Sequence, residues 1–173
     1  MWHIFAAIND YARMEIVIRK AEKKDMADVL GLINELAIFE NAPEEVAISV
    51  EDLQRDGFDH KPLFSVLLAE NARLPDGQEG EIAGMAFYYT AYSTWKGKML
   101  YLDDLVVLEK YRRHGVGQLL LDAVKSEAKA ENANQVRFHV LNWNETAITF
   151  YKKNNVSLDD EWILCKIEKE GIG

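Results

Sequence analysis

The chain has 173 residues, a formal net charge of −9 and a single cysteine, Cys165. This length suits one domain with a full hydrophobic core. One cysteine excludes an internal disulfide framework and favours a reducing, cytoplasmic setting. The acidic balance argues against nucleic acid as a partner, because phosphate binding needs clustered Lys and Arg. It suits a small cationic ligand, although the same acidity could serve solubility alone.

Targeting signals are not evident in the sequence. No apolar run approaches the ~18 residues of a membrane span, so we expect no membrane partner. The N-terminus lacks a basic stretch followed by an apolar one, as a secretory signal would have. Residues 1–13 do not join the pattern that follows, and we treat them as an N-terminal extension. Residues 14–173 are expected to form a single domain.

The periodicity of apolar residues predicts the elements of this domain. In chain order they are a strand over 14–19, helices over about 24–40 and 50–56, strands over 63–70, 82–89 and 99–108, a helix from Val116, a strand over 135–141, a helix over 145–153 and a strand over 162–168. Gly57 is expected to end the second helix, and 71–80 reads as a hairpin loop. Asn144 caps the 145–153 helix, which Asn154 and Asn155 end. This order indicates a mixed sheet with helices on both faces.

The most informative stretch is a buried strand, a basic turn and a helix start. The turn reads Arg112-Arg113-His114-Gly115-Val116-Gly117. Free N–H groups and the positive end of the helix dipole can bind a phosphate there. A Walker A loop is excluded, because no Lys-Ser or Lys-Thr follows the last glycine. A dinucleotide fingerprint is excluded too, because Leu120 stands where it needs a third glycine.

Two motifs carry a resemblance to a known family. Arg112 to Gly117 matches Arg/Gln-x-x-Gly-x-Gly/Ala, and Asn144-x-x-Ala147-x-x-Phe150-Tyr151 follows on a later helix. Together with the order of elements, they resemble the GNAT family of N-acetyltransferases. The stretches 36–40, 56–58, 92–97 and 101–104 are similar to its diamine acetyltransferase branch. The resemblance implies a GNAT-type α/β fold: a mixed, largely antiparallel sheet with splayed central strands and helices on both faces.

The resemblance also implies acetyl-CoA as cofactor. The loop would bind its pyrophosphate, and the backbone after Asp104 would pair with its pantetheine arm. Tyr151 would be the general acid that protonates the leaving thiolate, although it could instead be a core aromatic residue beside Phe150. The residues expected to bind the cofactor are Leu105, Val106, Val107, Arg112, Arg113, His114, Gly115, Val116, Gly117, Gln118, Asn144 and Tyr151.

The expected substrate is a small cationic amine, either a polyamine or diamine or a thialysine-like amino acid. Its binding residues would be Glu40, Trp95, Asp103 and Asp104. Since neighbours in a strand point to opposite faces, one aspartate would face the amine, and we favour Asp103 as the catalytic one. Lys96 or Lys98 could bind a substrate carboxylate. The alternatives are a non-catalytic acyl-CoA-binding regulatory domain and a protein or peptide N-acetyltransferase.

Three remaining features complete the expectations. Cys165 lies in an apolar stretch and is expected to be a buried small hydrophobe rather than a nucleophile. His114 and His139 have no metal-ligand spacing, so no metal is expected. Relatives in the family are homodimers, and we expect the last strand and the loop at 92–97 to form the interface.

Overall fold

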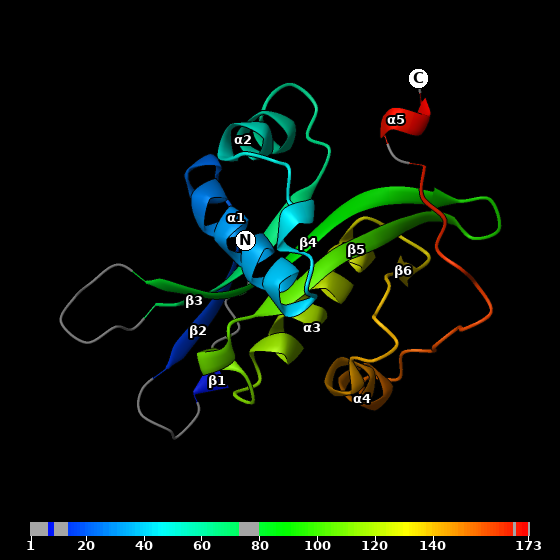
Figure 1. The fold of residues 1–173 in the computed structure, drawn as a ribbon. Helices are drawn as coiled ribbons and strands as arrows, with labels where there is room; N and C mark the ends of the chain where they lie inside the picture. The colour runs from blue at the N-terminus through cyan, green and yellow to red at the C-terminus, as the bar shows by residue number, and fades with distance from the viewer. Residues whose placement is uncertain (1–6, 9–13, 73–79, 168, 173) are drawn as a thin grey trace. The chain divides into compact units, whose positions relative to one another are not determined.

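The computed structural model describes residues 7–8, 14–72, 80–167 and 169–172 (Figure 1). The chain divides into two compact units, Met1–Phe138 and His139–Gly173, and each is described by itself. Within the described ranges, no helix is both long enough and apolar enough to cross a membrane.

The first unit is built on a six-stranded sheet with the strand order β1-β2-β3-β4-β5-β6 (Figure 1). All neighbouring strands pair antiparallel except β5 and β6, which are parallel. The strands are β1 (Ala7–Ile8), β2 (Glu15–Lys20), β3 (Ser65–Asn71), β4 (Glu81–Ser93), β5 (Gly97–Val107) and β6 (Val136–Arg137). The mixed, largely antiparallel sheet that the sequence predicts is therefore confirmed.

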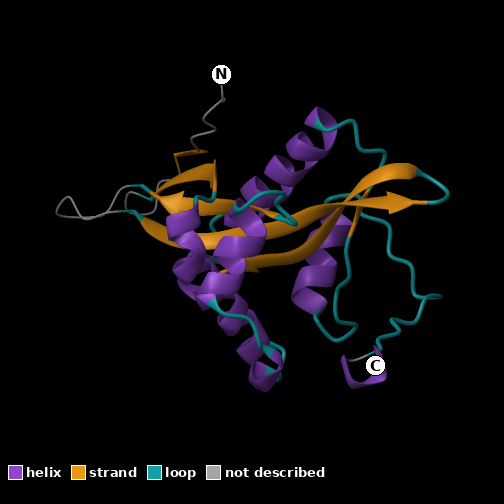
Figure 2. Ribbon diagram, turned by 90° about the horizontal axis from the view of Figure 1, so that it is seen from above, coloured by secondary structure: helices purple, strands orange, loops and turns teal. Residues whose placement is uncertain are grey.

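Helices cover both faces of this sheet (Figure 2). They are α1 (Met26–Phe39), α2 (Val50–Phe58) and α3 (Val116–Ala130), together with 3-10 turns at Lys23–Asp25, Pro43–Glu45 and Glu109–Tyr111. Side chains of α1 and α2 pack with one face of β3, β4 and β5 in a single buried cluster that includes Met26, Leu53, Leu68, Met85 and Val106. The α3 helix packs on the other face, against β3, β4 and β5.

Two carboxylates of α3 attach this helix to the sheet. Glu127, which is buried, accepts a hydrogen bond from the Tyr88 hydroxyl at 3.0 Å and pairs with Lys20 at 2.9 Å. One turn later, Glu131 pairs with Lys98 at 2.9 Å and accepts from the Thr90 hydroxyl at 3.1 Å. These bonds tie the C-terminal end of α3 to β2, β4 and β5.

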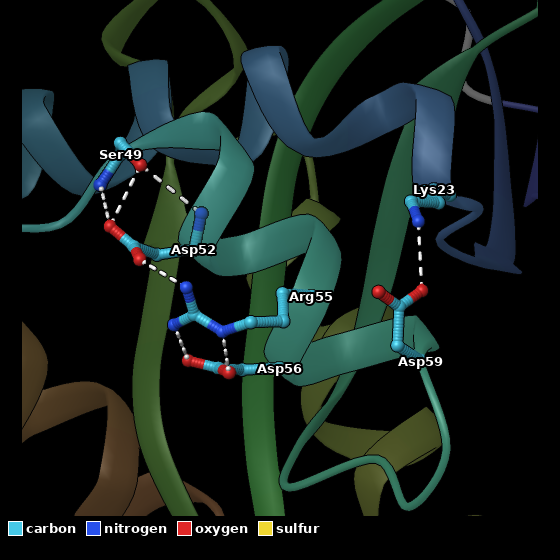
Figure 3. A network of polar contacts seen from close by, with 6 residues as sticks. All are labelled: Lys23, Ser49, Asp52, Arg55, Asp56 and Asp59. Carbon is cyan, nitrogen blue, oxygen red and sulfur yellow. Dashed lines mark hydrogen bonds and ion pairs between the residues drawn. The ribbon is translucent and has the colours of Figure 1, made fainter.

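The α2 helix begins as the sequence predicts but ends later. Ser49 forms a capping box with Asp52, in which each side chain accepts from the other residue's backbone N–H (Figure 3). Arg55 then bonds the carboxylates of both Asp52 and Asp56 (Figure 3). Gly57 does not end the helix: it lies inside α2, where a Cβ would come within 2.7 Å of the Phe64 ring. This glycine is a close-packing position and not a stop signal.

The β4–β5 hairpin is longer than expected. Tyr92 and Ser93, predicted to be in a loop, belong to β4, and only residues 94–96 form the turn. Gly84 marks a close approach between the two strands, because a Cβ there would lie 2.3 Å from the Val106 carbonyl oxygen. The side chain of any other residue would push β4 and β5 apart at this point.

The second unit contains α4 (Glu145–Lys153) and the short α5 (Lys169–Ile172). Only α5 is not predicted from the sequence. The predicted limits of α4 are confirmed. The Asn144 side chain accepts from the Ala147 N–H at 3.1 Å. At the other end Asn155 is left-handed, with φ 58. The N–H groups of Asn155 and Val156 donate back to Lys152 and Tyr151, which is a complete Schellman cap.

Two strand predictions and the expected burial of Cys165 are wrong. The strand expected over 135–141 is reduced to Val136–Arg137. Residues 162–167 form no strand within the described part of the chain, and position 168 lies outside it. Cys165 is exposed and not buried. Ala7–Ile8, assigned to an extension, pairs with β2 as an edge strand. Of the predicted loop at 71–80, positions 73–79 lie outside the described residues.

Candidate active site

The basic loop before α3 has the backbone of an anion site. Arg113 and Gly115 are left-handed, with φ 64 and φ 82. Gly115 is the N-cap of α3; no side chain among the described residues caps this end, and its first turn holds no acid. The N–H groups of that turn are therefore available to an anion, and the helix dipole favours one. A Cβ at Gly115 would meet nothing within 4 Å, so the space in front of the loop is open.

Arg112 connects this loop to two other elements. Its Nε donates to the Val107 carbonyl at 2.9 Å, at the end of β5. Its guanidinium carbon lies 5.8 Å from the centre of the Phe39 ring, in the last turn of α1, which is within cation–π range. Arg112 thus holds together the loop, the end of β5 and the end of α1.

The edge of β5 that faces β6 is largely unpaired. The β5–β6 ladder joins only Leu100 with Val136 and Tyr101 with Arg137. Beyond Tyr101, no described strand of the first unit lies beside 102–107 on this edge. The Leu105, Val106 and Val107 backbone is therefore the edge expected to bind an extended ligand, with the Val107 carbonyl already used by Arg112. Because this ladder is so short, β5 and β6 separate beyond it, as the resemblance to the GNAT family implies for the central strands.

Three predicted carboxylates come together beside this edge. Asp104 lies on β5, and Glu40 is the C-cap of α1. Burial, followed by the charges of Asp103 and Glu40, raises the pKa of Asp104 to about 6. A partly buried acid that titrates near neutral pH is suited to accept a proton from a substrate.

A β-bulge changes how the two adjacent aspartates are oriented. In the β4–β5 ladder Phe87 pairs with Asp104 and Tyr88 pairs with Leu102, so Asp103 is the extra residue. The alternation assumed from the sequence therefore breaks at this point. Tyr101, the partner of Tyr89, and Asp104, the partner of Phe87, share the face that α1 covers. The expectation that only one aspartate can serve this face rested on regular pleating, which the strand does not have.

A stacked tyrosine pair adjoins Asp103. Tyr89 and Tyr101 have ring centroids 5.1 Å apart and planes 21° from parallel. Burial, and next the charge of Asp103, raises the pKa of both phenols. The sequence analysis missed this pair. Their positions in facing strands were visible, but the register that stacks them depends on the bulge.

Other predicted substrate residues lie elsewhere. Trp95 is 82% exposed in the turn of the β4–β5 hairpin. Phe87, the pairing partner of Asp104, is followed by six more residues of β4, which span about 20 Å, and Trp95 lies beyond the end of this strand. Lys98 is engaged with Glu131. Within the first unit, the structure therefore groups Glu40, Asp103 and Asp104 and leaves Trp95 apart from them.

The second unit carries the remaining predicted residues. Tyr151 is 7% exposed on α4, and its ring lies 5.3 Å from that of Phe150. Asn144 uses its side-chain oxygen to cap the same helix. One helix and its cap thus hold both residues at fixed positions relative to each other.

Comparison with known proteins identifies similar chains. The model of the acetyltransferase (GNAT) family matches residues 33–155. Thialysine N-epsilon-acetyltransferase of Bos taurus is 38% identical over 161 residues, which cover 91% of this chain and 95% of the relative. The human spermidine/spermine N(1)-acetyltransferase-like protein 1 is 35% identical over 160 residues, which cover 90% of this chain and 23% of that protein.

Solved structures show the same fold at lower identity. An aminoglycoside acetyltransferase from a soil metagenome, in complex with trehalose, superposes with a TM-score of 0.70 at 18% identity, covering 88% of this chain and 95% of its own. An integron cassette protein from V. cholerae gives a TM-score of 0.70 at 23% identity, with 91% and 94% coverage.

Proposed function

The chain belongs to the GNAT family of acetyltransferases, and we propose that it transfers the acetyl group of acetyl-CoA to the primary amine of a small cationic molecule. The observation that carries the amine half is that Asp103 and Glu40 both act electrostatically on Asp104, which brings three carboxylates near one another beside β5. Such an amine is protonated at neutral pH, with a pKa of ~10, so three carboxylates attract it.

The cofactor half of the proposal rests on the start of α3. Acetyl-CoA supplies the thioester that the amine attacks. Its pyrophosphate would be held by N–H groups at Gly115, Val116, Gly117 and Gln118, by the charge of Arg113 and by the side chain of His114. The open space at Gly115 and the uncapped helix end fit this group. The Leu105 and Val106 backbone, on the unpaired edge of β5, would bind the extended arm.

Two proton transfers complete the reaction. The attacking amine must lose a proton, and we assign its acceptance to Asp104, directly or through water, because burial and the neighbouring carboxylates raise the pKa of this acid to about 6. This departs from the sequence-based choice of Asp103, which we assign to binding the cation. The departing thiolate needs a proton, and Tyr151 is our proposed donor. The new C–N bond forms as the C–S bond breaks.

We also propose a cytoplasmic homodimer. Support for a partner comes from apolar side chains left in water: Tyr92 and Trp95 at the hairpin tip are 77% and 82% exposed. In the second unit Trp162, Ile163 and Ile167 are 72%, 87% and 76% exposed. Exposed apolar side chains at this density are typical of interfaces.

The test of the proposed function is a panel of amines with acetyl-CoA. Spermidine, putrescine, thialysine and lysine would be compared by the release of free thiol and by mass spectrometry of the acetylated amine. We expect acetylation of at least one, with loss of turnover in Asp104→Asn. A wild-type protein that binds acetyl-CoA but acetylates no amine in the panel would contradict the proposal.

A further inference from the structure

One basic side chain lies on the substrate side of the sheet without an ion-pair partner among the described residues. Arg137, at the end of β6, is exposed, and its contact is a 3.4 Å hydrogen bond to the side-chain oxygen of Gln135. Other basic residues of the described sheet, such as Lys20, Lys98 and Lys110, are paired with carboxylates. An unpaired arginine next to an acidic site is a candidate binding group.

The sheet register fixes where Arg137 lies. It pairs with Tyr101 across the parallel β5–β6 ladder, so the two side chains project from the same face. Tyr101 in turn stacks on Tyr89 and lies two residues before Asp103 on β5. Burial and then the charge of Asp103 raise the pKa of the Tyr101 phenol, and the charge of Arg137 lowers it, so both charges act at the same hydroxyl.

The order of groups along this face is therefore acid, aromatic pair, base. Asp104 lies three residues from Tyr101, which is about 10 Å along the strand. Arg137 lies one strand further across, at about 4.8 Å. A polyamine has a cation at each end and would meet Arg137 as a like charge. An amino acid with an amine at the end of its side chain carries opposite groups in this same order.

We infer that Arg137 binds the α-carboxylate of the substrate, and that the enzyme acts on an amino acid with a terminal side-chain amine in preference to a diamine or polyamine. The α-ammonium group would lie over the Tyr89–Tyr101 stack beside Asp103, and the reacting amine would reach Asp104. Arginine suits this role, because its planar guanidinium binds a carboxylate through two parallel hydrogen bonds. This inference rests on the proposed function and names its substrate class.

Matched substrate pairs test it. Thialysine and lysine would each be compared with the diamine that differs only by loss of the carboxyl group, for lysine 1,5-diaminopentane. We expect the wild-type kcat/KM to be at least tenfold higher for the amino acid in each pair. Arg137→Gln should lower kcat/KM for the amino acids at least tenfold. For the diamines, kcat/KM should stay within about twofold of the wild-type value or rise, so the preference for amino acids is lost. Lys129 is an exposed basic residue of α3, and Lys129→Gln makes the same charge change. This control variant should keep the wild-type preference for amino acids.

The outcomes separate the two proposals. If the wild-type protein acetylates both members of each pair equally or prefers the diamines, Arg137 does not select a carboxylate and the inference is wrong, while the proposed function stands. The same holds if Arg137→Gln weakens both members of a pair equally with an unchanged melting temperature. If no amine is acetylated at all, the proposed function itself is wrong.

Discussion

Phe87 of β4 lies directly across the ladder from Asp104 of β5, and its ring stacks on Phe64 with centroids 4.3 Å apart. This aromatic pair lies on the side of Asp104 away from the open edge of β5. The carboxyl is therefore partly removed from water while two further carboxylates act on it, which is why its pKa is raised to about 6. The first two predictions follow from this arrangement.

The first prediction concerns the pH dependence of activity. In the free enzyme kcat/KM should rise with pH as Asp104 ionises, with a midpoint near its pKa of about 6. Glu40→Gln removes one of the two carboxylates that raise this pKa, so the midpoint should move to lower pH. Glu44→Gln, an exposed acid shortly after it in sequence, is the matched control. If the midpoint does not move in Glu40→Gln, a group other than Asp104 determines how kcat/KM falls at low pH.

The second prediction concerns the stability of the fold. A carboxyl whose pKa is higher in the folded chain than the ordinary 3.8 binds its proton more tightly when folded. The folded state therefore loses stability as pH rises from about 4 to about 6. Asp104→Asn should remove this loss and raise the free energy of unfolding near pH 8 by about 1 to 3 kcal/mol.

Urea denaturation at two pH values measures this effect. The gain from Asp104→Asn should disappear near pH 3, where both forms are neutral, and Asp160→Asn at an exposed site should show no gain at either pH. Activity should be lost in Asp104→Asn although the protein is more stable. A variant less stable than wild type near pH 8 would contradict the assigned pKa direction.

The third prediction concerns the loop before α3. Gly115→Ala places a side chain at φ 82 and in the open space of the proposed phosphate site. We expect KM for acetyl-CoA to rise severalfold and the fold to lose about 1 to 2 kcal/mol. Gly31→Ala, in the middle of α1 with nothing within 4 Å of the new Cβ, should instead gain up to ~1 kcal/mol and leave KM unchanged. If the two variants have the same KM for acetyl-CoA, Gly115 does not contribute to cofactor binding.

The fourth prediction concerns Tyr151. Tyr151→Phe removes only the hydroxyl from a residue that is 7% exposed, so the packing beside Phe150 should remain. A general acid accelerates a reaction by about 10²- to 10⁴-fold. We therefore expect kcat to decrease by a factor in that range, while the affinity for acetyl-CoA stays unchanged. Single-turnover kinetics and calorimetric titration measure the two quantities. If kcat is retained, another group or water protonates the thiolate.

The fifth prediction concerns the cap of α4. Asn155 is left-handed with φ 58 at the position that most often holds glycine. Asn155→Gly should raise the free energy of unfolding by up to ~1 kcal/mol, and Asn155→Ala should lower it by about the same amount. Thermal melts of the three proteins show the order directly. An alanine variant as stable as the glycine variant would mean that this cap does not constrain the chain.

Local signals in the sequence predicted the parts of this protein that depend on neighbouring residues. The limits of α4 follow from a capping asparagine at one end and a left-handed asparagine at the other. The glycine-containing loop and α3 follow equally from a few adjacent positions. Gly57 misled the prediction, because it looks like a helix stop and is small only to accommodate the Phe64 ring.

The remaining features depend on long-range geometry. The bulge at Asp103 arises from the pairing of two strands, and alternation within β5 alone cannot reveal it. Glu40 meets Asp104 because α1 ends above β5, and Arg137 meets Tyr101 because β6 pairs in a single register. The sequence of 162–167 is as apolar as a strand, but apolar composition does not specify a partner.

Arg112 has a consequence for how the two reactants would bind. Its Nε bonds the end of the strand that carries the aspartates, and its guanidinium lies over Phe39, the residue before Glu40. This one side chain therefore lies between the loop proposed to bind the anion and the two elements that carry the carboxylates. Any coupling that Arg112 carries between the two sites is reciprocal, so acetyl-CoA and the amine would change each other's affinity by the same factor.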